Sequence, residues 1–301
     1  MNDNKDELGY EIVDEEDCGG CEGGCDSCGG SCESCGGGCG EQDLMAKPHP
    51  QSRVRRVIRV VSGKGGVGKS MVTSMAAVLM NRRGYRVGVL DADMTGPSIP
   101  LTFGIHSRAQ ANDQGILPTK TGAGIGIMSV NLFLDEETEP VVWRGAIVGN
   151  TVKQFWTDVA WGDVDYMFVD MPPGTGDVPI TIFQSLPVDG IIVVTSPQEL
   201  VSMIVAKAVR MAQLMNVPIL GLVENMSWFR CHNCGEKHFI YGESRLEEVA
   251  KQYGLKVLAR LPIRPEVAAA VDKGHVEDVD FEELEPVADC LEQALPVEKD
   301  A

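Results

Sequence analysis

From residue 53 onward, the chain alternates between apolar runs and stretches with helical spacing. The apolar runs predict buried strands, and they read VRRVIRVVS, RVGVLDAD, YMFVD, GIIVVTS and PILGLVENMS. Helical patterns lie between several of them, notably MVTSMAAVLMNRR, which stops at Gly84, and residues 199–215. Strands that are apolar throughout and alternate with helices predict an α/β fold, in which helices cover both faces of a parallel sheet.

The first 50 residues lack this pattern. They are acidic, then rich in glycine and cysteine, and they end in KPHPQ, which is typical of a linker. We therefore expect a flexible tail over residues 1–50 and a compact domain over residues 51–301. An acidic amphipathic helix is expected from about Asp280, close to the end of that domain.

Negative charge is concentrated in the tail. Residues 1–43 hold thirteen acidic residues and one lysine, and they contribute −12 to the net charge of −18. An acidic segment of this kind argues against nucleic acid or an anionic membrane as a partner. The N-terminus lacks the apolar core of a secretory signal, and no apolar run is long enough to cross a bilayer. We expect a cytosolic protein, whose clustered thiols stay reduced and indicate metal or redox chemistry.

The motif GKGGVGKS follows the first predicted strand and precedes the first predicted helix. It matches the P-loop pattern G-x-x-x-x-G-K-[ST] in the context which that pattern requires. Its glycines let several backbone N–H groups converge on one anion. Lys69 is expected to reach the β- and γ-phosphates of a nucleotide, and the Ser70 hydroxyl to bind Mg²⁺. The expected nucleotide-binding residues of the loop are Gly63, Lys64, Gly65, Gly66, Val67, Gly68, Lys69 and Ser70.

Acidic residues end two of the predicted strands. Asp170 ends YMFVD and is expected to hold the Mg²⁺ shell, through water. Asp91 and Asp93 end RVGVLDAD; we assign Asp93 to orienting the attacking water and Asp91 to a structural role. The sequence PPGTGD after Asp170 is interpreted as a switch loop, in which the backbone near Gly174 senses the γ-phosphate.

Lys64 is a second lysine within the phosphate loop, and cradling a phosphate does not require it. In this it resembles the deviant P-loop ATPases, the class that includes the nitrogenase iron protein and the Min and Par ATPases. In that class the lysine reaches across a dimer to the nucleotide of the partner. The resemblance implies a homodimer with ATP sandwiched between its subunits and a catalytic role for Lys64.

Cys231 and Cys234 form a C-x-x-C motif, a spacing that lets two thiolates bind one metal or cluster. Two ligands are too few for a tetrahedral site. His232 or His238 would complete a zinc site, although we expect both to be ordinary polar residues. The same cysteine pair from a second subunit would instead give four thiolates, which suit a [4Fe-4S] cluster. A redox or structural pair is the third alternative.

Five motifs occur in order, namely SGKGGVGKS, LDADMTGPSIP, VVWRG, VDMPPGTGD and GLVENMSWFRCHNCG. Together they resemble the Mrp/ApbC family of iron–sulfur cluster carrier ATPases, relatives of the cytosolic Nbp-type scaffolds, from about Arg53 to Gly274. The resemblance implies a P-loop fold, ATPase activity, homodimerisation and a labile [4Fe-4S] cluster that bridges two subunits. It also implies that Asn225 contacts adenine. The chain departs from the family in having C-H-N-C where the family usually has C-P-x-C.

The tail carries seven cysteines at alternating intervals of three and four residues, and its glycines make a stable helix unfavourable. A polythiol of this kind suits a soft metal or a cluster. Nbp-type relatives carry an N-terminal cluster site with four cysteines at a different spacing. We expect a second cluster, or a holding site that feeds Cys231 and Cys234; the alternative is a disordered tail that collects zinc or buffers redox changes. Cys290 is expected to be a buried apolar residue. The candidate metal-binding residues of the tail are Cys18, Cys21, Cys25, Cys28, Cys32, Cys35 and Cys39.

The combined interpretation is an ATPase that uses ATP and Mg²⁺ to pass a [4Fe-4S] cluster to apo iron–sulfur proteins. One alternative is an ATP-gated electron-transfer protein resembling the nitrogenase iron protein, whose cluster stays bound and cycles between redox states. Another is a spatial regulator of the Min or Par type. That class requires a membrane-binding helix or a DNA-binding patch, and neither the C-terminus PVEKDA nor the acidic composition offers one.

Overall fold

The computed structural model describes residues 45–298, apart from residues 95, 114, 134–144, 175 and 198–200. The seven cysteines of the predicted tail lie outside the described residues. The division of the chain at residue 50 stays a prediction, because most of the predicted tail also lies outside them.

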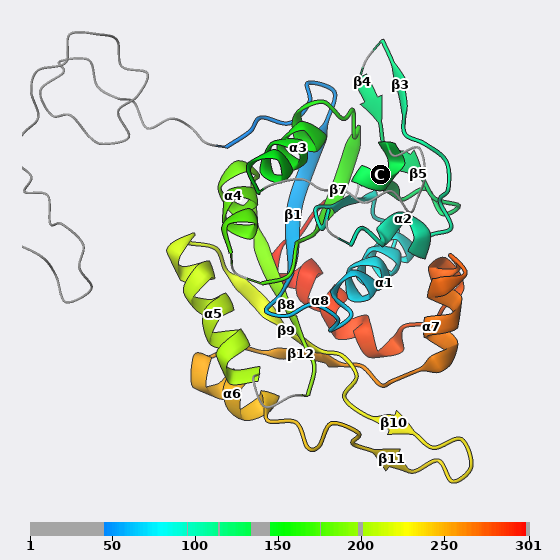
Figure 1. The fold of residues 1–301 in the computed structure, drawn as a ribbon, viewed down its shortest axis with the longest axis vertical. Helices are drawn as coiled ribbons and strands as arrows, with labels where there is room; N and C mark the ends of the chain where they lie inside the picture. The colour runs from blue at the N-terminus through cyan, green and yellow to red at the C-terminus, as the bar shows by residue number, and fades with distance from the viewer. Residues whose placement is uncertain are drawn as a thin grey trace, which may run out of the picture. The chain divides into compact units, whose positions relative to one another are not determined.

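Within the described part of the chain, eight strands form one central sheet. They are β1 (Arg53–Ser62), β2 (Val87–Asp91), β5 (Thr119–Lys120), β6 (Gly126–Met128), β7 (Asp163–Asp170), β8 (Gly190–Thr195), β9 (Ile219–Glu224) and β12 (Val257–Arg260). Their spatial order is β12-β9-β8-β1-β7-β2-β6-β5 (Figure 1). All neighbours are parallel except β5 and β6.

Two short antiparallel hairpins lie outside this sheet. They are formed by β3 (Gln110–Asn112) with β4 (Gly115–Leu117), and by β10 (Phe229–Arg230) with β11 (Lys237–His238). The β10–β11 hairpin projects from the body below the carboxyl ends of β1 and β9 in Figure 1. It carries the C-x-x-C motif.

Helices cover both faces of the sheet (Figure 1). The described helices are α1 (Lys69–Arg82), α2 (Ile99–Thr102), α3 (Gly145–Thr157), α4 (Asp177–Ser185), α5 (Val201–Leu214), α6 (Leu246–Tyr253), α7 (Pro265–Asp272) and α8 (Glu285–Ala294), with 3-10 turns at Val130–Phe133, Val276–Asp278 and Glu282–Leu284. α1 contacts α2 and α8 on one face, whereas α3 packs on α4 and α5 packs on α6 on the other. None of the helices in the described ranges is long and apolar enough to span a membrane.

The five strands predicted from the sequence are β1, β2, β7, β8 and β9. β2 and β8 are buried throughout, and β1, β7 and β9 are buried apart from their first residues, as apolar runs require when both faces of a sheet are covered. The predicted α/β fold with a parallel sheet is therefore confirmed. β5, β6 and β12 extend the sheet further, and they are too short for a periodic pattern to reveal them.

The predicted C-terminal helix is α8, which packs on α1 and β12. Its apolar side contributes Leu291 to the core. Its acidic side faces Arg83, just after α1, whose guanidinium pairs with Glu285, with Asp289 at 2.8 Å and with Glu292 at 2.7 Å. The acidic, amphipathic pattern thus corresponds to a helix that docks through both of its faces.

Strand register brings three loops to one edge of the sheet. Val60 of β1 lies opposite Asp170 of β7, and Asp170 in turn lies opposite Asp91 of β2. Because parallel strands all end at the same edge, the segments that follow β1, β2 and β7 meet there. The predicted phosphate loop and both predicted acidic positions lie on these three segments.

Candidate nucleotide and metal sites

The phosphate loop joins β1 to α1, and α1 begins at Lys69. Gly68 has φ of 82°, a left-handed conformation that glycine adopts without strain. A Cβ at Gly68 would lie 2.2 Å from Nδ2 of Asn225, so a larger residue would displace that side chain. Within the loop, Gly63, Gly68 and Ser70 are half-buried, Val67 and Lys69 are buried, and Lys64, Gly65 and Gly66 are exposed.

Lys69 points into the edge where the strands end. Its Nζ lies 2.8 Å from Oδ2 of Asp170 and 3.7 Å from Oδ2 of Asp93, and the side chain is 5% exposed. A buried ammonium is stabilised by such carboxylate partners. This ammonium therefore sits between the two acidic residues that the sequence singled out.

Asp170 is fully buried and accepts two further hydrogen bonds. The Ser70 hydroxyl donates to its Oδ2 at 2.6 Å, and the Thr73 hydroxyl donates to its Oδ1 at 2.8 Å. Mg²⁺ prefers oxygen ligands. The oxygens of Ser70 and Asp170 therefore fit the donor set that Mg²⁺ would take, and their predicted roles stay predictions. Thr73 was missed from the sequence, although it lies one helical turn after Lys69.

Asp91 is fully buried and fastens the segment that follows β2. Its carboxylate accepts hydrogen bonds from Oγ of Ser129 at 3.1 Å, N of Asp93 at 3.2 Å and N of Ile99 at 3.4 Å. Burial, together with the negative charge of Asp170, raises the pKa of Asp91 to about 8. Its contacts position the backbone of Asp93 and the start of α2.

A cavity of about 470 Å³ opens at this edge. Its walls include the exposed glycines of the phosphate loop, Lys69, Ser70 and Asp93. Pro173, from the segment after β7, closes one side, and the next N–H, that of Gly174, donates to O of Ser62 at 2.9 Å. Backbone N–H groups, one ammonium and hydroxyl groups around such a space suit a polyphosphate.

Asn225 follows β9 and is 1% exposed. Its Nδ2 donates to O of Val67 at 3.0 Å, and its Oδ1 accepts from N of Met226 at 2.9 Å. Met226 has φ of 60°, a strained conformation for a residue other than glycine. Asn225 thus ties the end of β9 to the phosphate loop.

An apolar pocket of about 120 Å³ lies beside Asn225. Its lining comes from α1, from the turn after β9 and from the segment between β12 and α7. A flat aromatic base fits walls of this kind, where apolar groups outnumber a few polar ones. The sequence analysis identified only Asn225 here; the other lining residues include Met71, Met75, Met226, Pro262, Ile263 and Arg264.

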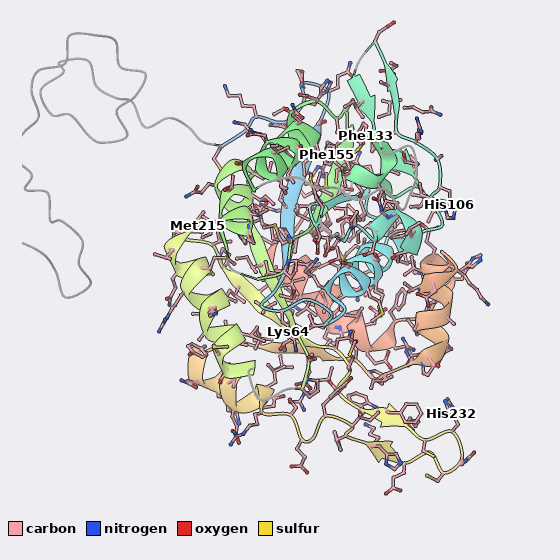
Figure 2. The ribbon with its side chains drawn as sticks, viewed as in Figure 1. Lys64, His106, Phe133, Phe155, Met215 and His232 are labelled. Atoms are coloured by element: carbon pink, nitrogen blue, oxygen red, sulfur yellow. The ribbon has the colours of Figure 1, made fainter. Side chains whose placement is uncertain are left out.

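Lys64 lies at the start of the loop with its side chain exposed (Figure 2). It does not line the phosphate cavity, which contains Lys69. The predicted role of Lys64 at a second subunit stays a prediction.

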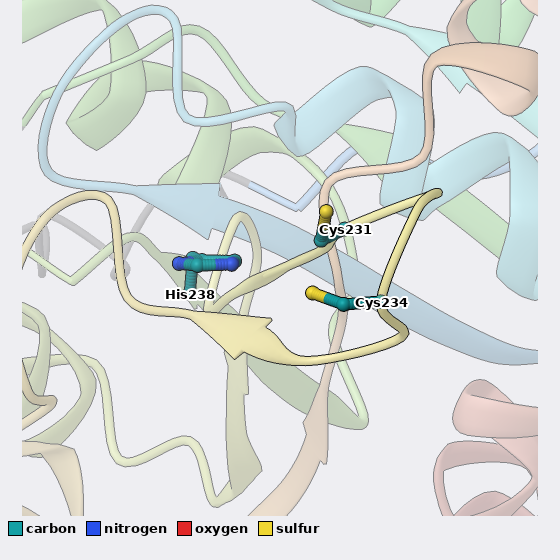
Figure 3. Close-up of side chains that lie close together, drawn as sticks. All are labelled: Cys231, Cys234 and His238. Carbon is teal, nitrogen blue, oxygen red and sulfur yellow. The ribbon is translucent and has the colours of Figure 1, made fainter.

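The β10–β11 hairpin brings together Cys231, Cys234 and His238. One ligand atom of each residue lies within 4.8 Å of the other two (Figure 3). The turn between the strands is closed by two backbone hydrogen bonds, from N of Cys231 to O of Glu236 at 2.9 Å and from N of Gly235 to O of Cys231 at 2.8 Å. The hairpin therefore adds a third donor to the two that the motif supplied.

The two histidines of this segment lie in different environments. The His232 ring packs edge-on against the ring of Phe229, with centroids 5.5 Å apart, whereas His238 joins the cysteine pair. His238 is thus near enough to the thiols to be a candidate third ligand, and our expectation that both histidines are ordinary polar residues stays a prediction. The spacing alone did not distinguish them, because it does not specify which side of the hairpin each one faces.

The Cys231 thiol has a lowered pKa, because N–H groups of Cys234 and Asn233 donate hydrogen bonds to it. Cys290 differs. Its half-buried thiol lies 3.7 Å from O of Leu220, and burial raises its pKa. The lowered pKa favours the thiolate form of Cys231. Cys290 is half-buried and not fully buried as expected, and its thiol donates to a backbone carbonyl.

Comparison with known proteins adds an independent observation. The model of a ParA-type family, described as NUBPL iron-transfer P-loop NTPase, matches residues 53–294. The chain belongs to this family. The resemblance recognised from the five motifs is thereby confirmed, and this NUBPL-type chain is a P-loop NTPase.

Named relatives cover most of the chain. An iron-sulfur cluster carrier protein of Clostridium perfringens is 42% identical over 233 residues, which make up 75% of this chain and 82% of the relative. The cytosolic Fe-S cluster assembly factor CFD1 of Kluyveromyces lactis is 39% identical over 241 residues, 77% of this chain and 85% of the relative.

A solved structure also matches this NUBPL-type chain. It is a nucleotide-binding protein of Archaeoglobus fulgidus in complex with ADP, in which cobalt was found by PIXE. It is 38% identical, with a TM-score of 0.70, over 77% of this chain and 91% of that one. The match supports the nucleotide-binding fold described above.

Proposed function

We propose that this chain is an ATP-dependent iron–sulfur cluster carrier, which binds a [4Fe-4S] cluster through Cys231 and Cys234 and passes it to apo-proteins. The observation that carries the proposal is the attachment of a thiolate hairpin to the edge of the sheet that holds the phosphate loop. Relatives named as cluster carriers and as a cytosolic assembly factor support it. That name also supports a cytosolic location for this chain.

The nucleotide site is proposed to hydrolyse ATP. The Lys69 ammonium holds the β- and γ-phosphate oxygens, Asp93 orients the attacking water, and Asp170 and Ser70 hold Mg²⁺. When bound, Mg²⁺ neutralises charge that develops on the phosphate oxygens. Asn225 places the base in the apolar pocket, and it also holds the phosphate loop through Val67.

The working form is proposed to be a homodimer. Cys231 and Cys234 of one chain supply two thiolates, and the same pair of a second chain completes the four that a [4Fe-4S] cluster takes. The exposed Lys64 reaches the nucleotide bound by the other chain. ATP binding would therefore draw two chains together, and hydrolysis would release them.

Glu224 links the nucleotide site to the hairpin. It is the residue before Asn225, and its fully buried carboxylate accepts hydrogen bonds from the hydroxyls of Ser227, at 2.7 Å, and Ser244. These two serines stand at either end of residues 228–243, which carry the hairpin. One carboxylate therefore fixes both ends of the cysteine segment directly beside a nucleotide contact.

A second link runs through Pro262, Ile263 and Arg264. These residues line the apolar pocket beside Asn225, and they also line a cavity of about 420 Å³ that contains Cys231. N of Ile263 donates to O of Trp228 at 2.7 Å, so this wall is bonded to the strand that leads into the hairpin. A base bound in the apolar pocket would contact these three residues, which also line the cavity beside Cys231. This shared contact supports coupling between ATP binding and cluster release.

The tail cysteines are proposed to hold a second cluster or to feed the hairpin. Seven thiolates on a glycine-rich segment supply more soft ligands than one cluster needs. Cys231 and Cys234 remain the proposed site from which a cluster leaves, because the hairpin that carries them is attached to the nucleotide edge.

Anaerobic reconstitution of the full chain with iron and sulfide tests the proposal. Wild type is compared with a Cys231→Ser/Cys234→Ser variant, and with a variant that has serine at all seven tail positions. Iron and sulfide per chain, Mössbauer spectra and transfer to an apo-protein are measured. The tail variant should still form and transfer a [4Fe-4S] cluster, and the hairpin variant should not transfer one. A hairpin variant that transfers as wild type would refute the assignment.

A further inference from the structure

Strand register places three side chains on one face of the β10–β11 hairpin. Phe229 pairs with His238 across the two strands, so both side chains point to the same face. Cys231 lies two residues after Phe229, and side chains two residues apart in extended backbone share a face. His238 and Cys231 are therefore held on the same side by the pairing of the strands.

The turn of the hairpin adds Cys234. Gly235 has φ of 74° and donates from its N–H to O of Cys231, which closes a tight turn around the two cysteines. N–H groups of Cys234 and Asn233 point at the Cys231 sulfur. These contacts all lie within one chain, and they hold the Cys231 sulfur beside the turn that carries Cys234.

The distances suit a single ion. A tetrahedral metal with bonds of about 2.0 to 2.3 Å holds its ligand atoms roughly 3.3 to 3.8 Å apart. The two sulfurs and the imidazole nitrogen already lie within 4.8 Å of one another. Rotation of the exposed side chains of Cys234 and His238 closes the remaining distance of about 1 Å without moving the backbone.

We propose that Cys231, Cys234 and His238 of one chain bind a single divalent ion of the zinc or iron(II) class. Two thiolates and one imidazole are the mixed sulfur and nitrogen set that such ions prefer. The fourth position is left for water or an external ligand. The ion and the proposed bridging cluster use the same two cysteines, so they are alternative occupants of the hairpin. The ion needs neither nucleotide nor a second chain, and its binding can therefore be tested apart from the proposed cluster transfer.

A cavity of about 420 Å³ adjoins one of the three ligands. Cys231 lines it together with Arg264, Glu266 and Glu283. Arg264 is paired with Glu283 at 3.6 Å, so its charge is already balanced within this cavity. Two thiolates and a neutral imidazole neutralise a divalent ion without help from these groups.

Cobalt(II) alone is the probe, because tetrahedral thiolate coordination gives it visible d–d bands and near-ultraviolet sulfur-to-cobalt bands. The full chain carries serine at all seven tail positions, so that tail thiols do not compete. It is titrated without oxygen, nucleotide, iron or sulfide, and His238→Ala is compared with the matched variant His232→Ala. Far-ultraviolet circular dichroism confirms that the variants are folded.

The expected result is one cobalt per chain with tetrahedral bands, unchanged in His232→Ala and bound at least about 10-fold more weakly in His238→Ala. Equal binding by His238→Ala and the parent would overturn the site, as would one cobalt per two chains. The Lys69→Ala variant distinguishes the cobalt site from the proposed function, because it should lose ATP-dependent cluster transfer and still bind cobalt as the parent does. Failure of cluster transfer would likewise leave the cobalt result untouched.

Discussion

The nucleotide edge and the cysteine hairpin are built in opposite ways. At the edge, Lys69 and Asp170 are buried, paired at 2.8 Å and supported by an eight-stranded sheet. The hairpin has strands of two residues, and Cys234 and His238 are exposed. Preorganised buried charges suit a reaction that is repeated without rearrangement, whereas exposed ligands suit a site that must release what it binds.

The difference assigns nucleotide chemistry to the buried edge and metal or cluster exchange to the exposed hairpin. In the proposed mechanism the two regions communicate through Glu224, which bonds both ends of the cysteine segment, and through residues 262–264, which line both cavities. If the two regions have these separate roles, a variant in one region should leave the chemistry of the other unchanged. The following changes test it, in order of expected effect.

Lys69→Ala should lower the rate of ATP hydrolysis at least about 100-fold, because a buried ammonium no longer stabilises the phosphate oxygens. Cobalt binding at the hairpin should stay unchanged. Phosphate release and cobalt spectra are measured on the same preparation, with Lys251→Ala, an exposed lysine on α6, as the matched control. Loss of cobalt binding in Lys69→Ala would break the separation of the two regions.

Asp165 is a buried carboxylate on β7 that lies far from the nucleotide edge. It tests whether such a carboxylate contributes to stability without affecting ATP hydrolysis. It accepts hydrogen bonds from N of Arg86 at 2.9 Å and from its guanidinium at 2.9 and 3.1 Å. Burial alone would raise the pKa of Asp165, but the bonds to Arg86 and the charge of Arg55 outweigh it and lower that pKa. This ion pair therefore stabilises the fold above about pH 4, and the stabilisation is lost as the pH falls through the lowered pKa.

Asp165→Asn should lower the free energy of unfolding by about 2 kcal/mol at pH 7, and the gap to wild type should narrow below about pH 4. Urea unfolding at several pH values measures both. ATP hydrolysis by the folded variant should remain within about twofold of wild type. A gap that widens on acidification would contradict the role assigned to Arg86.

Glu224→Gln tests the proposed link between the nucleotide edge and the hairpin. It keeps the size of the side chain and removes the charge that both serines and Arg260, at 3.7 Å, face. The acceleration of cluster release by ATP should fall about fivefold, and basal hydrolysis should change little. The matched control is Glu247→Gln, since Glu247 also pairs with Arg260, at 3.4 Å, but is exposed. Equal effects of the two changes would argue against a special role for Glu224.

Sequence alone was sufficient for the features that are contiguous or recur at strand ends. The octapeptide of the phosphate loop is one unbroken motif, and Asp170 could be placed because a buried apolar run predicts where its strand ends. The parallel sheet followed from the same runs. Thr73 was within reach as well, because it lies one helical turn beyond Lys69.

Other features depend on pairings that no local pattern encodes. Ser244 meets Glu224 across 20 residues, because the intervening segment returns to the end of β9. Residues 262–264 reach the base pocket because β12 pairs with β9. His232 lies between the two cysteines and His238 follows Cys234 by four residues, and these spacings alone do not show which histidine lies near both thiols. The pairing of Phe229 with His238 across the hairpin decides it.

The most direct test of the account is the rate at which a reconstituted [4Fe-4S] cluster passes to an apo-protein, measured with ATP and with ADP for wild type and Lys69→Ala. The account predicts at least about tenfold faster transfer with ATP in wild type and no nucleotide effect in Lys69→Ala. Equal transfer by the two proteins with ATP would contradict the claim that the nucleotide edge controls the cysteine hairpin.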